Sequence, residues 1–423
     1  MMDIAVSTEN LLAALRLTPV GDAAIAVNTK DATPLFSMII TGSDLYTHFA
    51  STHASTCVVP LSEPVADGDT VLAVATMGYS EVIRFQSILK NAGNMTGIRF
   101  RDKTILISSQ PVSATLPIEF IFQEEKPADP TVAYASLIVN AMINQKKYRA
   151  EFTGTASDIL SGIYAAEPPV SSATGTTDFQ RYLRLRVTDH IVMSGYSPTA
   201  LTHVRVPLHD STCDDNVLIV PDTLRAALAA VTDKNVPLHF RIPFKGAYMD
   251  TLYGADEAKF FFRLPIIQGD NQIIRAMGMV EDIIAQLDGQ PETVFTVNTR
   301  ELSKAYSATK LSFSGRDSTV SFENTTTACI LIGRDGVAKL SQTVPIAITQ
   351  DNCPAAHQVF MFPTRPNFVN EIKKAANVYG SSPEVEIRMR ELALENMAQG
   401  VAPKVFYTVT MPGYCLHTML ETP

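Results

Sequence analysis

Few residues of this 423-residue sequence stand at spacings that would support catalysis. Asp189 and His190 are adjacent and could form an acid–base pair, but neighbouring residues of a strand point to opposite faces of its sheet. The sequence contains no phosphate-binding loop, no GxGxxG turn, and no HExxH or GxSxG motif. The acidic residues are scattered, and no two of them have the spacing of a catalytic carboxylate pair. We therefore expect no enzymatic activity.

The cysteines are also poorly placed for chemistry. They are Cys57, Cys213, Cys329, Cys353 and Cys415. No two of them form a CxxC pair, and none has histidines at zinc-site spacing. An odd, scattered set is typical of free thiols buried in a reducing compartment. We expect neither a metal ion nor a cofactor.

Basic residues, by contrast, recur near the ends and polar faces of predicted helices. They are Arg16, Arg84, Lys90, Lys146, Lys147, Arg149, Arg225, Lys234, Arg300, Lys304, Lys373 and Lys374. Any one of them could simply be a solvated helix residue. Their recurrence in a chain of net charge −9 indicates one shared basic surface, which could contact nucleic-acid phosphates of any sequence.

Six predicted strand–helix units position these residues. In each unit an apolar strand leads through a polar or proline-containing cap into an amphipathic helix of about three turns. In one of them Asn298 and Glu301 have the spacing of a capping box. The units cover residues 3–17, 70–91, 129–147, 216–234, 294–310 and 358–378. Equivalent apolar helix positions are Leu11, Val82, Leu137, Leu224, Leu302 and Phe368.

Alternating and β-branched segments between the helices predict several strands in each block. Helices separated by blocks of strands are typical of an α+β protein with antiparallel sheets. Pairing the six units gives three similar domains of about 140 residues, each with two helices backed by sheets. Proline-rich or charged linkers near 124–130 and 288–292 place these domains at residues 1–126, 127–290 and 291–423.

The composition is that of a well-packed chain, with 46% hydrophobic and 18% charged residues. The N-terminal segment lacks the basic and apolar regions of a secretory signal. No stretch of about 18 apolar residues could span a bilayer. We expect a soluble, cytoplasmic protein without a membrane partner.

Three domains of two strand–helix units resemble the bacterial DNA polymerase III beta subunit, the beta sliding clamp. The first domain is similar mainly in pattern, and further motifs follow in the family's order. ILSGIY (159–164) resembles a family strand with a Leu-x-Gly core, and YLRLRVTDHIVMSGY (182–196) resembles the stretch LRLVATDGHRLA. Three other similar segments are VLIVPDTLRAALAAV (217–231), FFFRLPIIQGDNQIIRAM (260–277) and FTVNTRELSKAYSAT (295–309). VFYTVTMPGYCL (405–416) resembles the closing strand.

The chain departs from the family pattern at several of these motifs. His190, Ile191 and Val192 stand where the family has Gly-His-Arg, and residues 271–274 replace Phe-Pro-Asp-Tyr. After Met411 the chain continues through Cys415 and eight further residues. The resemblance is therefore to a divergent member of the family.

The resemblance implies a head-to-tail homodimeric ring around double-stranded DNA, with the basic helices facing the duplex. Such a ring tethers the replicative DNA polymerase and other partners, and a clamp loader places it on DNA. It also implies a pocket for a partner peptide between the second and third domains. The residues carried over to this pocket are Leu160, Thr188, His190, Ile191, Val192, Met193, Gln272, Met277, Thr410, Met411 and Pro412.

Two other interpretations remain open at this point. A structural assembly protein, such as a viral shell or tail component, would also be rich in strands and in Ser, Thr and Ala. It would not need recurring strand–helix units with basic helices. A trimeric clamp of two-domain subunits is the other alternative, and the chain length and the six units favour three domains.

Overall fold

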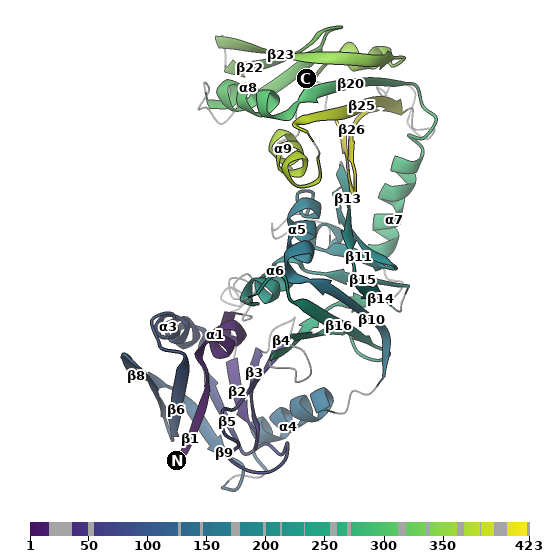
Figure 1. Ribbon diagram of the computed structural model, residues 1–423. Helices are drawn as coiled ribbons and strands as arrows, with labels where there is room; N and C mark the ends of the chain where they lie inside the picture. The colour runs from purple at the N-terminus through teal and green to yellow at the C-terminus, as the bar shows by residue number, and fades with distance from the viewer. Residues whose placement is uncertain are drawn as a thin grey trace. The chain divides into compact units, whose positions relative to one another are not determined.

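The computed structural model describes most of the chain. The described residues are 1–16, 36–49, 55–125, 128–143, 147–170, 178–197, 200–211, 214–231, 233–253, 260–268, 272–311, 319–335, 338–361, 368–380, 382–392 and 404–420. They divide into two compact units. Figure 1 shows their helices and strands. Unit 1 comprises residues 1–160, 187–189 and 207–267, and unit 2 comprises 161–186, 190–206 and 268–423.

Unit 1 contains two antiparallel sheets. Its strands are β1 (Met2–Ser7), β2 (Phe36–Ile40), β3 (Asp44–Phe49), β4 (Ser55–Pro60), β5 (Ala73–Met77), β6 (Met95–Arg101), β7 (Thr104–Ser109), β8 (Val112–Pro117), β9 (Glu119–Phe122), β10 (Tyr148–Thr155), β14 (Asp210–Ser211), β15 (Asp215–Ile219), β16 (Pro237–Pro243), β17 (Tyr248–Tyr253) and β18 (Phe260–Pro265). The four-stranded sheet has the order β1-β6-β7-β8, and the ten-stranded sheet runs β14-β10-β16-β17-β18-β4-β3-β2-β5-β9. Its helices are α1 (Thr8–Arg16), α3 (Tyr79–Leu89), α4 (Pro130–Ile143) and α6 (Pro221–Ala230).

Unit 2 is built around one long series of strands. They are β11 (Leu183–Val187), β12 (His190–Tyr196), β13 (Ala200–Pro207), β20 (Glu292–Asn298), β21 (Thr319–Asn324), β22 (Ala328–Asp335), β23 (Ala338–Asp351), β24 (Val359–Met361), β25 (Glu384–Leu392), β26 (Lys404–Met411) and β27 (Tyr414–Met419). They pair in the order β11-β12-β13-β27-β26-β25-β20-β23-β22-β21-β24. The helices are α7 (Gln272–Ala285), α8 (Thr299–Leu311) and α9 (Phe368–Tyr379), with short 3₁₀ turns η1 (Asp178–Arg181) and η2 (Pro354–His357). Helix α5 (Ala156–Ala166) and strand β19 (Ile267–Gln268) are divided between the units.

The residues beyond Cys415 have a structural role in unit 2. Strand β27 pairs with β26 on one side and with β13 on the other, where Ala200 lies opposite Thr418 and Val204 opposite Tyr414. The predicted boundary near 290 falls in the turn between α7 and β20, and the boundary at 126–127 lies outside the described residues. Because the two units divide the predicted middle domain, the three-domain division stays a prediction.

The amphipathic pattern explains how most helices pack. Leu11, Val82, Leu224 and Leu302 are all buried, as expected for equivalent positions on the core-facing sides of their helices. The side-chain oxygen of Asn298 accepts hydrogen bonds from the backbone N–H groups of residues 300 and 301, at 3.0 and 3.3 Å. This confirms the N-cap predicted for α8.

The structure corrects three sequence-based expectations. Residues 159–164, expected as a strand, lie within helix α5, and α5 directly follows strand β10. The third predicted helix exists as α4, but Leu137 on it is 68% exposed, so it does not occupy the expected core position. Helix α7 was also not expected. The described residues therefore form eight α-helices, compared with six predicted.

Candidate nucleic-acid interface

Helix α1 holds the first predicted basic residue at its C-terminal end. It contacts both α3 and α6, and α1 and α3 lie side by side in Figure 1. The side-chain amide of Gln86 on α3 donates a 2.8 Å hydrogen bond to the carbonyl of Leu15 on α1. Because Leu15 is fully buried and Arg16 is exposed, packing directs the guanidinium into solvent.

Lys234 lies close to Arg16 and also closes the end of α6. Its ammonium donates to the carbonyls of Leu228 and Ala229, at 2.7 and 2.8 Å. These carbonyls belong to the last turn of α6, where a cation is favoured by the helix dipole. Burial lowers the pKa of Lys234, and the positive charge of Arg16 lowers it further. The two helices therefore bring two basic residues near one another in unit 1.

The other predicted basic residues of unit 1 differ in exposure and in their distance from acidic side chains. Arg84 is exposed and only 3.9 Å from Glu81, and Lys90 is exposed just beyond the end of α3. Arg225 is partly buried and ion-paired with Asp222. Lys147 is exposed, Arg149 is a strand residue 3.0 Å from Asp215, and Lys146 lies outside the described residues.

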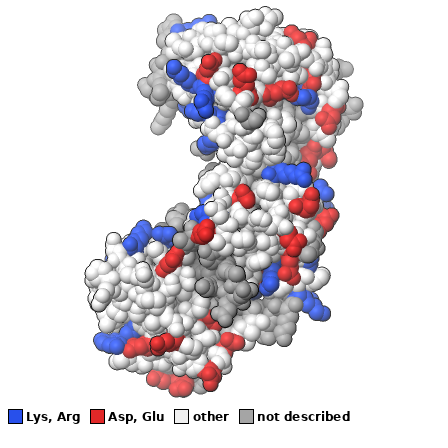
Figure 2. All heavy atoms as spheres, in the orientation of Figure 1, with Lys and Arg blue, Asp and Glu red and all other residues white. Residues whose placement is uncertain are grey.

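Helices α8 and α9 of unit 2 form the most basic helix pair. They contact each other, and the cations predicted on them, Arg300, Lys304, Lys373 and Lys374, are all exposed. Lys374 is 2.7 Å from Glu371, which offsets part of its charge. Figure 2 shows blue spheres gathered over α8 and α9, and a second group over α3.

Lys310 was missed by the sequence analysis although it belongs to the same helix. It is exposed in the last turn of α8, and its ammonium lies 6.0 Å from the centroid of the Tyr306 ring. With Lys310, α8 carries three basic residues and one acidic residue. Helix α5, by contrast, contains no Lys or Arg. The basic charge is therefore spread unevenly over the helices.

The candidate partner-peptide residues fall into a buried group and a more accessible group. Ile191, Met193 and Met277 are at most 1% exposed, and Met411 is 8% exposed. The Met193 sulfur packs 3.0 Å from the position that a Cβ atom would take on Gly162. In this conformation these four side chains belong to the core and offer little surface to a peptide.

The remaining candidates are accessible at least in part. Thr188 donates a 3.0 Å hydrogen bond to the Asp189 carboxylate. The exposed residues are Gln272, Thr410 and Pro412, and the half-buried ones are Leu160, Thr188, His190 and Val192. Thr410 lies on β26, and Pro412 and Gly413 form the turn between β26 and β27. The Gly413 carbonyl accepts a 2.7 Å hydrogen bond from the N–H of Arg205 on β13.

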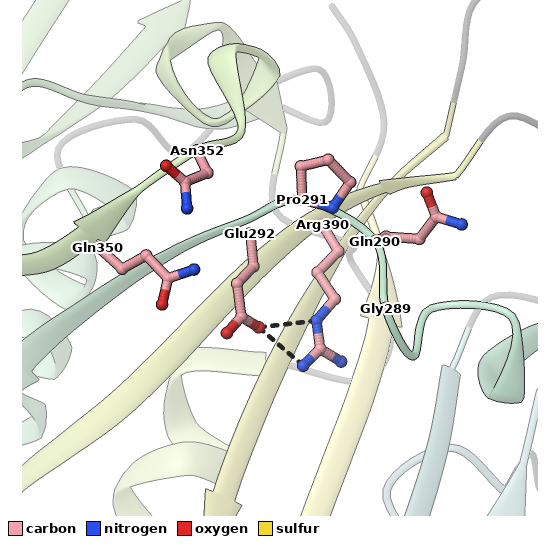
Figure 3. A pocket seen from close by; sticks show the side chains of 7 residues that line it. All are labelled: Gly289, Gln290, Pro291, Glu292, Gln350, Asn352 and Arg390. Atoms are coloured by element: carbon pink, nitrogen blue, oxygen red, sulfur yellow. Dashed lines mark hydrogen bonds and ion pairs between the residues drawn. The ribbon is translucent and has the colours of Figure 1, made fainter.

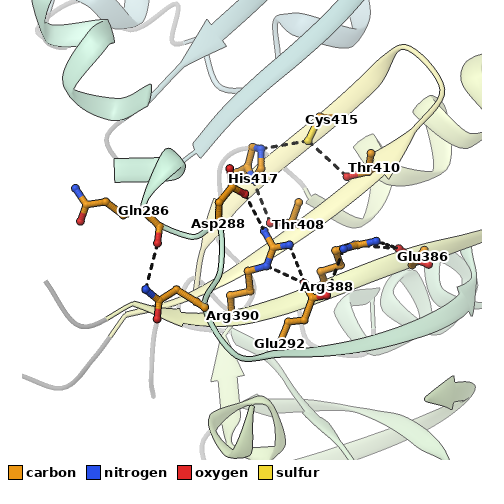
Figure 4. Close-up of polar contacts among 11 residues, drawn as sticks. Gln286, Asp288, Glu292, Glu386, Arg388, Arg390, Thr408, Thr410, Cys415 and His417 are labelled. Atoms are coloured by element: carbon orange, nitrogen blue, oxygen red, sulfur yellow. Dashed lines mark hydrogen bonds and ion pairs between the residues drawn. The ribbon is translucent and has the colours of Figure 1, made fainter. Parts of the chain in front are cut away.

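A cavity of about 470 Å³ opens where α7 is joined to β20 in unit 2 (Figure 3). Gln290, Gln350 and Asn352 line it with amide groups, together with Arg390 and Glu292. The Arg390 guanidinium is 2.7 Å from the Glu292 carboxylate, and Figure 4 shows Asp288 on its other side. Because carboxylates already neutralise this arginine, the cavity is a poor site for phosphate.

Burial keeps two cysteines and one histidine of the described residues in their neutral forms. Burial raises the pKa of Cys57 and raises that of Cys329 to about 12, which keeps both as thiols. Burial lowers the pKa of His417 to about 4, and its ring contacts Thr408 and Cys415 (Figure 4). Among the described residues, no group of three or more His, Cys, Asp or Glu side chains could hold a metal ion. No described helix is long and apolar enough to cross a membrane.

No protein-family model matches the chain, and a search of curated proteins finds no match. Solved structures give clear similarities. A putative DNA polymerase III beta subunit from Eubacterium rectale aligns over 100% of both chains with a TM-score of 0.69 and 10% identity. A DNA polymerase sliding clamp from Pseudomonas aeruginosa and a DNA polymerase III beta subunit from Thermotoga maritima each align over 100% of both chains, with TM-scores of 0.65 and 12% identity. The chain therefore has the sliding-clamp fold along its whole length.

Proposed function

We propose that this chain is a DNA sliding clamp, a non-catalytic ring subunit that encircles duplex DNA and tethers the replicative DNA polymerase. The observation that carries the proposal is the similarity to solved sliding clamps, because the alignments cover 100% of both chains. The exposed basic residues on α1, α3, α8 and α9 support it, because these are the helices expected to face DNA.

The proposed action is topological. A closed ring stays on DNA without tight binding, and tight binding would prevent it from sliding. Scattered Lys and Arg side chains suit this task, because contacts to phosphates alone are independent of sequence and weaken with salt. Such a surface is compatible with a chain of net charge −9, since only the field near the duplex matters.

Ring formation would require two copies joined head to tail. Strand β8 is the edge of its four-stranded sheet in unit 1, and no described strand pairs with its outer side. An edge strand offers free N–H and C=O groups to a strand of a second copy. We propose β8 as one half of the closing contact, with a clamp loader opening the ring. A replication role also leads us to propose the cytoplasm as its compartment.

The proposed partner-peptide site includes residues at the surface of unit 2. Its exposed residues in unit 2 are Gln272, Thr410 and Pro412. Substitution of these residues by alanine should weaken binding of a polymerase-derived peptide without changing the mass of the ring. Because the family's positively charged and aromatic positions are altered here, the preferred peptide sequence should differ from that of other clamps.

Trapping on circular DNA tests the encircling function. The protein is diluted to monomers, mixed with a nicked plasmid, and concentrated so that dimers re-form in the presence of the circle. A ring should remain on the circle in high salt, which removes electrostatic binding, and should be released when one restriction cut linearises the plasmid. If the protein dissociates equally from circular and linearised DNA in high salt, the proposal is contradicted.

A further inference from the structure

Helix α4 covers one face of the ten-stranded sheet in unit 1. Its residues Val132, Ala135 and Val139 pack against a buried cluster that includes Ile39 and Val74. Tyr46 belongs to the same cluster, and Val58 packs against it. The Tyr134 hydroxyl reaches His48 at 3.4 Å.

This face of the sheet is opposite the one toward which α1 lies. Val58 on β4 packs toward α4, so its neighbours Cys57 and Val59 point to the other face, because side chains alternate along a strand. Both are buried, at 1% and 0% exposure, and α1 contacts this strand. Helix α4 therefore lies on the side of the sheet away from the proposed DNA-facing helices of unit 1.

The outer face of α4 is uncharged and largely apolar, with Asn140 as its exposed polar side chain. None of the 14 residues of the helix is charged. Tyr134 is 49% exposed, Leu137 68% and Ile143 40%. Helices on a protein surface normally carry charged residues on the solvent side, and contiguous exposed apolar side chains commonly mark binding sites.

A cavity of about 320 Å³ adjoins this face. Val71, Val139 and Ile143 contribute apolar lining, Thr70, Ser136 and Asn140 contribute polar groups, and Asp69 contributes a carboxylate. The exposed loop that holds Asp69 also carries Glu63 and Asp67, and it contains no Lys or Arg between residues 61 and 70. Asp69 therefore places a negative charge beside the apolar surface, on a loop that is acidic.

We propose that the outer face of α4 and the adjoining cavity form a docking site for a peptide segment of a partner protein. The segment carries apolar side chains that cover Tyr134 and Leu137, and a neighbouring Lys or Arg that enters the polar cavity and pairs with Asp69. Charge complementarity with the acidic loop selects this basic flank. The site goes beyond the proposed DNA role, because a partner bound here leaves the opposite face of the sheet free.

A peptide selection on the intact protein tests this inference. A phage-displayed library of random peptides is enriched on the wild-type chain, and the enriched peptides are synthesised with a fluorescent label. Their affinities are then measured by anisotropy. We expect peptides with apolar residues beside Lys or Arg whose binding weakens at least about tenfold in Leu137→Asp, because a charge would replace an apolar contact.

Further variants separate charge from general damage. Asp69→Asn should weaken the same peptides about threefold at low ionic strength and less at high salt. Met279→Asp is the matched control, because Met279 is a 67% exposed residue of α7 in unit 2. It should leave peptide affinity unchanged, and far-ultraviolet circular dichroism should show all three variants folded.

Three results would overturn the proposal. In the first, no enriched peptide distinguishes the wild type from Leu137→Asp. In the second, the sensitive peptides carry acidic rather than basic flanks. In the third, Leu137→Asp lowers the mass of the protein in solution, which would make this face a contact between copies of the chain instead of a peptide site.

Discussion

His48 is a buried side chain whose charge state affects the stability of unit 1. Its ring nitrogens contact the Thr56 hydroxyl at 2.9 Å and the Tyr134 hydroxyl at 3.4 Å, and neither partner carries a charge. Burial lowers the pKa of His48 from 6.5 to about 4. Between these values the unfolded chain binds a proton that the folded chain excludes.

The free energy of unfolding should therefore decrease as the pH falls from 6.5 toward 4, by up to about 3 kcal/mol from this residue. Urea unfolding at several pH values measures this dependence. His48→Gln should reduce the change of unfolding free energy with pH. Some of this change should remain, because His417 has a similarly lowered pKa. An unchanged slope in His48→Gln would contradict the assignment. His357, whose pKa is raised by the Asn324 carbonyl and by Asp351, contributes with the opposite sign.

Asp250 and Arg263 form a buried ion pair, with two N–O distances of 2.6 and 2.9 Å. The guanidinium also stacks 3.7 Å from the centroid of the Tyr248 ring and donates to the Ala141 carbonyl at the end of α4. Burial raises the pKa of Asp250, and Arg263 opposes that rise. Removal of either charge leaves the other buried without its partner.

Asp250→Asn should lower the free energy of unfolding by about 3–5 kcal/mol. Asp222→Asn is the control, because it breaks the more exposed pair with Arg225 and should cost less than about 1 kcal/mol. Chemical denaturation of both variants provides the comparison. A cost for Asp250→Asn no larger than that of the control would show that the buried pair does not stabilise unit 1.

At the scale of elements, sequence periodicity located helices with one clear apolar face. It failed at α5, where Ile159 and Ile163 are buried four residues apart but the β-branched and aromatic composition favours a strand. Gly162 also argues against a helix, yet a side chain there would clash with Val206. Helix α4 was mistaken for a unit of the repeat because its residues are apolar on both faces. Tertiary packing decides these cases, and sequence pattern alone does not contain it.

The charges of α8 and α9 should govern binding to DNA. Lys304→Glu combined with Lys373→Glu should weaken binding of short duplex DNA at low salt by about tenfold or more and reduce the salt dependence, because fewer counterions are released. Fluorescence anisotropy at several salt concentrations measures both effects.

Arg101→Glu combined with Lys103→Glu is the matched control for this experiment. Both residues are exposed in the β6–β7 hairpin, and the pair changes the net charge by the same amount. Its affinity for DNA should stay much closer to that of the wild type. Equal loss in the two double variants would mean that total charge, and not the α8–α9 surface, controls binding.

For the whole molecule, recurring strand–helix patterns predicted the α+β class and the antiparallel sheets. The clamp fold was predicted from the resemblance of ordered motifs to a known family. The residues of the candidate site were harder to predict from the sequence. Exposed cations such as Lys304 and Lys373 were predicted correctly as surface residues, whereas Met193 and Met277 proved to be core residues. A strand-end motif does not reveal which side chains the neighbouring elements cover. Met277 lies on α7, a helix that the sequence pattern did not indicate, so its burial could not be predicted.

Two copies of the chain should close into a ring wide enough for duplex DNA. Small-angle X-ray scattering coupled to size-exclusion chromatography measures both the mass and the shape of this assembly. We predict twice the 46.1 kDa mass of one chain and a radius of gyration clearly above about 28 Å, the value for a compact particle of that length. The profile should also require a central hole. A compact monomer with a radius of gyration near about 22 Å at micromolar concentration would contradict the account.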